Sequence, residues 1–260
     1  MTERAERTAE ASAAEALDLE GVSRHFGALV ALDSVDLSIR AGERRAVLGA
    51  NGAGKTTLFN CITGDFPPTR GRIRFFGENI TDLPPHQRIR RGLRRTYQNS
   101  LLFRRLTVFD NLFLAVRGAT RGRFSVVRAG RGDGAAERAR ALMQAVHLEH
   151  AADRRVGELS HGEQRQLEIG LALAGAPRFI LFDEPAAGLA PRERSELVAI
   201  LRALPAHIGY IIIEHDLDVA LRVVESVTVM HNGRIFKEGT PQEIENDREV
   251  QDIYLGGKHG

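Results

Sequence analysis

The sequence predicts an α/β fold with a central sheet of parallel strands. Three short apolar runs, at residues 44–49, 178–185 and 210–216, are each followed by sequence compatible with a helix. Such continuous apolar runs are typical of strands that are buried on both faces of a sheet. Between the first two runs, from about residue 107 to 175, strand signals disappear and helical patterns take over. This break predicts a helical subdomain inserted into the α/β core.

A second group of strands is predicted outside the central sheet. The segment 17–39 reads as short strands with a turn, and GRIRFFGENI from Gly71 adds another strand pair. Together they predict an antiparallel β subdomain. Near the C-terminus Asn232-Gly233 separates two strand-like runs, which is the signal of a type I′ hairpin.

Composition limits the class of protein. The chain has 260 residues, 43% hydrophobic and 27% charged, with a net charge of +2, which is typical of a folded globular protein. We expect a flexible tail over residues 1–16 and one domain over 17–260. No apolar run is long enough to cross a bilayer, no signal sequence is recognisable, and the single cysteine, Cys61, fits a reducing compartment. These features predict a cytoplasmic protein.

Arginines cluster between Arg117 and Arg131, where they alternate with Gly and Ala. A patch for single-stranded nucleic acid would interleave basic and aromatic residues. We therefore interpret this cluster as a solvated loop and expect no nucleic-acid partner.

The segment GANGAGKT, residues 49–56, matches the Walker A pattern of a P-loop and lies between a predicted strand and a predicted helix. The glycines allow backbone N–H groups to surround phosphates, Lys55 supplies a point charge, and the Thr56 hydroxyl can bind magnesium. The alternative is a Gly-rich turn that matches the pattern by chance, but such a turn would not have to lie between a strand and a helix. The predicted nucleotide-binding residues here are Gly49, Asn51, Gly52, Ala53, Gly54, Lys55, Thr56 and Thr57.

A second metal ligand is needed beside a Walker A loop, and the apolar run FILF ends in Asp183-Glu184. Asp183 is predicted to position magnesium. Glu184 is the predicted general base for the attacking water. The alternative for Glu184 is a carboxylate at a strand end that is exposed to solvent.

The stretch VGELSHGEQ, residues 156–164, predicts a helix start. Ser160 and Glu163 have the spacing of a capping box, in which each side chain binds a backbone N–H group of the other residue. Gly162 lies inside that first turn, where Gly is costly relative to Ala. A helix N-terminus that is open at a glycine suits an anion, most often a phosphate.

Taken together, the Walker A loop, Gln98, LSHGEQ, Asp183-Glu184 and His215 resemble an ABC-type ATPase domain over residues 17–255. The resemblance implies a P-loop NTPase core in which Ser160, Gly162 and Glu163 bind the γ-phosphate of an ATP held by another subunit. It also implies that Phe26 stacks on adenine and that His215 contacts the γ-phosphate. Gln98 is implied in catalysis and metal binding, in a loop that links the metal site to a membrane partner. Individually, Phe26, Gln98 and His215 are equally compatible with structural roles.

Two positions depart from the family pattern. Glu163 stands where the family usually has Gln, and both residues serve at the third helical position of a capping box. Ala190 in EPAAGLAP stands where the family commonly has Asp or Asn. This second departure bears on coupling between subunits.

The segments 94–115 and 239–256 resemble the ATPase subunits of importers for branched-chain amino acids and of related urea and amide importers. The resemblance implies ATP and Mg²⁺ as cofactors and transmembrane permease subunits as partners. It also implies a second ATPase subunit, in a homodimer or a heterodimer, and an indirect link to an extracytoplasmic solute-binding protein. The expected location is peripheral, on the cytoplasmic face of the plasma (inner) membrane.

Two other classes of function are compatible with a P-loop. A soluble ABC ATPase that drives chromosome maintenance would carry a long coiled-coil insertion, and a translation-type factor would carry two Walker A loops; the sequence has neither. A small-molecule kinase would leave LSHGEQ unexplained. A non-transport protein assembly remains the alternative to an importer.

Overall fold

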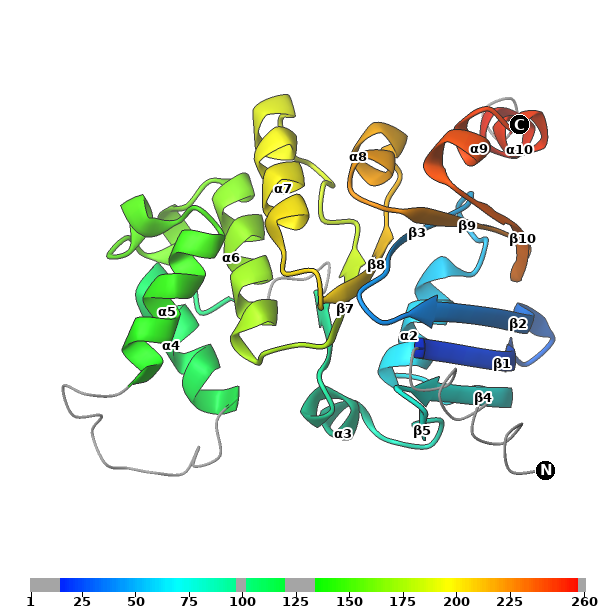
Figure 1. Cartoon of the computed structure of the whole chain (residues 1–260), viewed down its shortest axis with the longest axis horizontal. Coiled ribbons are helices and arrows are strands. Elements are labelled where there is room, and N and C mark those ends of the chain that lie inside the picture. Colours follow the sequence, from blue (N-terminus) through cyan, green and yellow to red (C-terminus); the bar gives the residue numbers. More distant parts are fainter. Residues whose placement is uncertain (1–14, 97–101, 120–133, 257–260) are drawn as a thin grey trace. The chain divides into compact units, whose positions relative to one another are not determined.

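The protein is described by a computed structural model over residues 15–96, 102–119 and 134–256, with the last four residues given as backbone only. The chain divides into two compact units (Figure 1). The first, here the core unit, comprises Met1–Arg94, Arg178–Glu184 and Pro205–Gly260. The second, here the helical unit, comprises Arg95–Pro177 and Pro185–Leu204.

A six-stranded sheet with the order β10-β9-β3-β8-β7-β6 forms the centre of the α/β fold. Strand β3 pairs in parallel with β8, and β8 pairs in parallel with β7. Every residue of β7 and β8 is buried, which explains their continuous apolar sequences. The three predicted parallel strands are thereby confirmed. The strands are β3 (Arg44–Leu48), β6 (Leu93–Thr96), β7 (Phe179–Asp183), β8 (Gly209–Ile213), β9 (Ser226–His231) and β10 (Arg234–Gly239).

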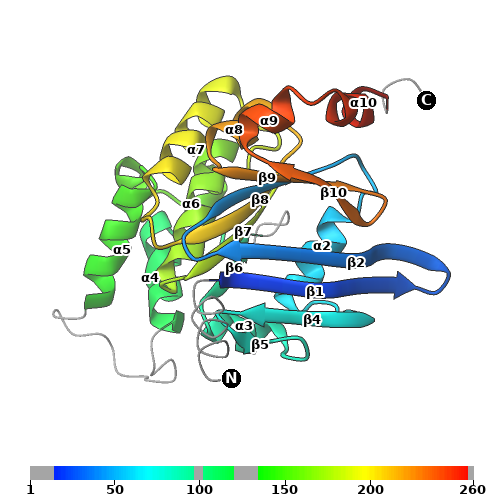
Figure 2. The ribbon, with the colours of Figure 1, turned by 45° about the vertical axis from the view of Figure 1, so that its right-hand side comes forward.

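The predicted antiparallel subdomain is a four-stranded sheet with the order β2-β1-β4-β5, seen in Figure 2. Its strands are β1 (Glu15–Phe26), β2 (Leu29–Arg40), β4 (Arg70–Phe75) and β5 (Glu78–Asn79). The β9–β10 hairpin turns at Asn232 and Gly233, whose φ angles are 48° and 76°. Two positive φ angles agree with the predicted type I′ turn.

Helix α2 (Lys55–Thr63) packs its apolar side chains into a cluster with residues from both sheets. Cys61 is fully buried in this cluster, and burial raises the pKa of its thiol to about 11. The thiol is therefore protonated at neutral pH and behaves as a small apolar side chain. The other helices in the described part of the core unit are α3 (Pro85–Arg90), α8 (Leu217–Arg222), α9 (Pro241–Glu245) and α10 (Arg248–Gly256).

Arg88 of α3 is 1% exposed, and its guanidinium closes the C-terminal end of α2. Nη1 donates to the carbonyl oxygens of Cys61 and Ile62, at 2.7 and 2.8 Å. Nε donates to the Leu83 carbonyl and Nη2 to the Thr81 carbonyl. A cation at a helix C-terminus satisfies carbonyl groups that have no partner within the helix.

We expect Arg88→Met to destabilise the core unit by about 3 kcal/mol, because four carbonyl groups would lose a charged donor. Equilibrium denaturation in urea measures this loss. The matched control is Arg90→Met, which removes an exposed arginine from the same helix. Equal midpoints for the two variants would show that the Arg88 hydrogen bonds add no net stability.

Three helices of the helical unit pack against one another, α4 (Val108–Ala119), α5 (Gly134–Ala145) and α6 (His161–Ala174) (Figure 1). Helix α4 begins after Thr107, whose hydroxyl accepts a hydrogen bond from the N–H of Asp110 at 3.0 Å. The unit also contains α7 (Pro191–Ala203), in addition to the segment 107–175. Among the described residues, no helix is both long and apolar enough to span a membrane. Most of the predicted arginine-rich loop, residues 120–133, lies outside them.

Candidate nucleotide-binding site and signature helix

Three neighbouring parallel strands of the core unit end at the same edge of the sheet. The Walker A loop follows β3, His215 lies two residues beyond β8, and Asp183-Glu184 closes β7. Ligand sites of open α/β sheets lie at the carboxyl ends of the strands. The fold therefore gathers the Walker A loop, Asp183-Glu184 and His215, which are far apart in sequence, at one edge.

The Walker A loop has a conformation that excludes side chains at two glycines. Gly49 and Gly54 have φ angles of 153° and 102°. A Cβ atom at Gly49 would lie 2.4 Å from the Met230 carbonyl oxygen, and one at Gly54 would lie 2.7 Å from the Ala31 carbonyl oxygen. Both contacts are too short for any side chain, so the loop can form only with glycine at these positions.

The interior of the loop is suited to a polyphosphate. Helix α2 starts at Lys55, and its first turn carries Thr56 and Thr57 without an acidic residue. Lys55 Nζ donates to the carbonyl oxygens of Gly49 and Ala50, at 2.7 and 3.0 Å, which holds the ammonium across the loop. A helix N-terminus with an adjacent ammonium attracts phosphate oxygens.

Burial lowers the pKa of the Lys55 ammonium, while the carboxylates of Glu184 and Asp183 favour its charged form. The ammonium therefore lies in the field of both carboxylates, Asp183 and Glu184. Asp183, at the end of β7, is 2% exposed.

The backbone conformation of Glu184 cannot be predicted from the sequence around it. Its φ angle is 49°, in the left-handed region, and its N–H donates to the Ile213 carbonyl oxygen at 2.9 Å. A residue with a Cβ in this region costs about 1–2 kcal/mol, and such strain concentrates at functional sites. The turn aims the carboxylate at His215, with Oε1 2.8 Å from Nε2. The structure thus brings together the predicted base and the predicted γ-phosphate contact.

The candidate magnesium ligands within the described chain are the Thr56 hydroxyl and the Asp183 carboxylate. No group of three or more His, Cys, Asp or Glu residues able to hold a metal occurs in the described ranges. Magnesium in nucleotide sites keeps waters and phosphate oxygens and uses one or two protein ligands, so these two residues fit it. Gln98, the third predicted ligand, lies outside the described residues.

Phe26 lies in an exposed aromatic cluster at the end of β1. It is 39% exposed and makes an edge-to-face contact with Phe66, with ring centroids 5.6 Å apart. The Arg24 guanidinium lies 4.6 Å from the centre of the Phe26 ring. Phe26 is therefore not a core residue. A ring that is open on one side and supported on the other can stack on a base. Sequence analysis did not identify Arg24 or Phe66.

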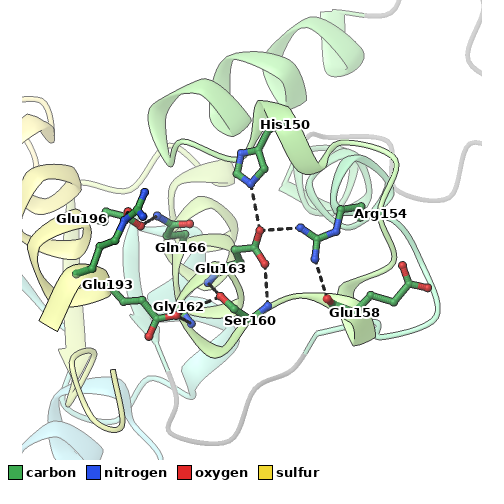
Figure 3. A network of polar contacts seen from close by, with 10 residues as sticks. His150, Arg154, Glu158, Ser160, Gly162, Glu163, Gln166, Glu193 and Glu196 are labelled. Atoms are coloured by element: carbon green, nitrogen blue, oxygen red, sulfur yellow. Dashed lines mark hydrogen bonds and ion pairs between the residues drawn. The ribbon is translucent and has the colours of Figure 1, made fainter. Parts of the chain in front are cut away.

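The predicted capping box at the start of α6 is confirmed (Figure 3). The Glu163 N–H donates to Ser160 Oγ at 3.1 Å, and the Ser160 N–H donates to Glu163 Oε2 at 2.7 Å. The other carboxylate oxygen, Oε1, lies 2.8 Å from Arg154 Nη1 and 3.1 Å from His150 Nε2. Burial raises the pKa of Glu163, but these hydrogen bonds outweigh burial and the net shift is downward. Glu in place of Gln is thus an ionised side chain with a cationic partner, Arg154.

A residue that sequence analysis missed, Glu193 of α7, also binds this helix start (Figure 3). Its Oε1 accepts hydrogen bonds from the Gly162 N–H at 3.0 Å and from Ser160 Oγ at 3.2 Å. Its Oε2 accepts from the Ala190 N–H at 3.0 Å, which caps α7. Hydrogen bonds, foremost from the Ala190 N–H, lower the pKa of Glu193. A Cβ at Gly162 would lie 2.5 Å from Glu193 Oε1, so the glycine makes room for a carboxylate of the same chain.

Known proteins share both the sequence pattern and this architecture. The ABC transporter family matches residues 32–187. The branched-chain amino acid transport ATP-binding protein BraF of Pseudomonas aeruginosa is 36% identical over 92% of this chain and 97% of BraF. The lipopolysaccharide export ATP-binding protein LptB of Escherichia coli is 37% identical over 86% of this chain and 90% of LptB. The crystal structure of the ADP conformation of the cassette MJ1267 covers 93% of this chain and 99% of that cassette, with 33% identity and a TM-score of 0.83. The chain is therefore an ATP-hydrolysing, nucleotide-binding subunit of the ABC transporter family.

Proposed function

We propose that the chain energises an importer for branched-chain amino acids or related small polar solutes. The supporting observation is the similarity to BraF, which extends over 97% of that protein at 36% identity. The segments 94–115 and 239–256, which resemble importer ATPases, lead to the same proposal.

ATP is proposed to bind with its phosphates in the Walker A loop and its adenine on Phe26. Lys55 and the first-turn N–H groups of α2 would hold the outer phosphates. Magnesium, held by the Thr56 hydroxyl, Asp183 and Gln98, would neutralise charge that develops on the phosphates. The remaining loop contacts are assigned to Gly49, Asn51, Gly52, Ala53, Gly54 and Thr57.

Glu184 is proposed to take the proton of the attacking water. Its left-handed backbone fixes the direction of the carboxylate, and His215 holds Oε1 at 2.8 Å. Because that contact leaves Oε2 for a water, Glu184 can act as base while His215 orients it and contacts the γ-phosphate.

Ser160, Gly162 and Glu163 belong to the segment LSHGEQ, residues 159–164, here called the signature. They are proposed to serve an ATP bound by a second ATPase subunit, identical or different. The same complex would include transmembrane permease subunits at the cytoplasmic face of the inner membrane. An extracytoplasmic solute-binding protein would deliver the solute to those permeases.

The similarity to LptB supports a second candidate, a subunit of a lipid exporter. Coexpression with candidate permease subunits, followed by reconstitution into liposomes, separates the two. For an importer, ATP hydrolysis should rise several-fold when a binding protein loaded with a branched-chain amino acid is added. Stimulation by lipopolysaccharide alone would favour the exporter. ATP hydrolysis without membrane association would favour a non-transport assembly.

We expect Ala190→Asp to stabilise the helical unit by about 1 kcal/mol, because Ala190 is the N-cap of α7 and offers no side-chain acceptor. Nucleotide affinity should stay nearly unchanged, whereas hydrolysis by the assembled complex should change, since this loop is expected at the subunit interface. Urea denaturation and ATPase assays of the complex measure the two effects. Ala190→Val, which adds bulk without an acceptor, is the control. Identical turnover of the Asp variant and the native complex would show that the departure has no effect on coupling.

A further inference from the structure

Two hydrogen-bond donors at the start of α6, the Gly162 N–H and the Ser160 hydroxyl, both bind the Glu193 carboxylate (Figure 3). These are the donors that the proposed function assigns to the γ-phosphate of the second subunit's ATP. We propose that Glu193 is an internal substitute for that phosphate. It must leave before two ATPase subunits can close on ATP, and it thereby sets the ATP concentration at which they pair. The inference rests on the proposed function.

The donors cannot serve both anions. A serine hydroxyl has one proton, and a carboxylate can only accept, so Ser160 Oγ donates to Glu193 Oε1. The same oxygen already accepts from the Glu163 N–H at 3.1 Å. The Gly162 N–H also has a single proton, and at 3.0 Å it points at Glu193 Oε1. A γ-phosphate oxygen in this position therefore has to replace Oε1.

Charge also prevents the γ-phosphate and the Glu193 carboxylate from binding the same donors at the same time. The hydrogen bonds that lower the pKa of Glu193 keep its carboxylate ionised at neutral pH. Two anions at hydrogen-bond distance from the same donors repel each other, so phosphate and carboxylate cannot share the helix start. Donors that are already engaged gain less from a new acceptor than free donors do.

The geometry also provides a way to release Oε1. Glu193 Oε2 is held separately by the Ala190 N–H at 3.0 Å, within the first turn of α7. The two carboxylate oxygens thus have different donors, so loss of the Oε1 contacts does not by itself remove the donor of Oε2. Ser160, Gly162 and Glu193 all belong to the helical unit, so Glu193 occupies the two donors without any contribution from a second subunit.

The test is pairing of the full chain as ATP is titrated, in the Glu184→Gln background, which is expected to bind ATP without hydrolysing it. Light scattering reports the mass, with the partner ATPase added if the chain does not pair with itself. Adding Glu193→Gln, which keeps the shape but removes the charge, should lower the ATP concentration for half-maximal pairing about tenfold. Glu193→Ala, which empties the position, should lower it further. In the native background, Glu193→Gln should raise basal ATPase activity at low ATP.

The matched control is Glu196, one turn further along α7, which contacts Gln166 and Arg192 instead of the α6 start. Glu196→Gln removes the same charge from the same helix and should leave the titration unchanged. Thermal unfolding measures the stability of each variant. In Glu193→Ala it shows how much stability is lost with the hydrogen bond that caps α7.

The outcomes separate the inference from the function on which it rests. If Glu184→Gln pairs with ATP but the Glu193 variants need the same or more ATP, Glu193 is a positioning residue for Ser160 and the inference is overturned alone. An equal shift in Glu196→Gln overturns it too, because the effect would be general charge. If neither Glu184→Gln nor its Glu193 variants pair with ATP, both proposals fail. Pairing only after Glu193 is replaced supports the inference most directly.

Discussion

Glu184→Gln is expected to bind ATP with the affinity of the native chain and to lose about 10²- to 10⁴-fold in the rate of hydrolysis, the usual contribution of a positioned base. The substitution keeps the length of the side chain, and an amide oxygen or nitrogen can still face His215 Nε2. It removes the negative charge of the carboxylate and with it the capacity to accept a proton at neutral pH. Single-turnover hydrolysis with radiolabelled ATP, together with equilibrium nucleotide binding, measures the two effects separately.

His215→Gln serves as the comparison, because it removes the group 2.8 Å from Glu184 Oε1 but leaves the base in place. We expect a smaller loss of rate in that variant. Turnover by Glu184→Gln at the native rate would remove Glu184 as the base.

The second large effect is expected from two inactive variants that restore activity when mixed. Lys55→Ala should abolish ATP binding, because the ammonium held across the Walker A loop is lost. Ser160→Arg should leave ATP binding by the isolated subunit intact and block hydrolysis at the site completed on its partner. If the chain pairs with itself, each mixed dimer joins one intact Walker A loop to one intact signature. The mixture should therefore hydrolyse ATP well above either variant alone.

Exchange of subunits has to be confirmed by pull-down through a tag on one variant. Ser160→Arg also removes the acceptor of the Glu163 N–H, at a cost of about 1 kcal/mol, so its unfolding curve is the stability control. No gain in activity despite confirmed exchange would contradict a homodimeric shared site, and the partner ATPase should then replace one variant. Loss of ATP binding by the isolated Ser160→Arg subunit would show that the signature serves its own nucleotide.

Local sequence patterns were sufficient for most of the fold. Continuous apolar runs identified β3, β7 and β8 because these strands are buried on both faces, and Asn232-Gly233 identified its hairpin because few residue pairs tolerate two positive φ angles. The α6 capping box was equally legible, since both of its partners lie within four residues. Each of these features is decided by neighbours in sequence.

The features that escaped prediction depend on tertiary contacts. Glu193 reaches the α6 start across 31 residues of sequence, and its role follows only from the packing of α7 against α6. The left-handed backbone of Glu184 is maintained by a hydrogen bond to Ile213 on a neighbouring strand. Arg24 and Phe66 join Phe26 through the fold of the core unit. No residue type or spacing marks such contacts in a single sequence.

The strained turn at Glu184 also coincides with a junction in the chain. Glu184 is the last residue of one segment of the core unit, and Pro185 is the first residue of a segment of the helical unit. The peptide bond between these two residues joins the two units directly. The ψ angle of Glu184 is therefore the last backbone torsion before the segment of the helical unit begins. Because proline restricts the residue before it, that torsion is already confined to a narrow range. The strained residue proposed as the base therefore lies at the point where the chain passes from one unit to the other.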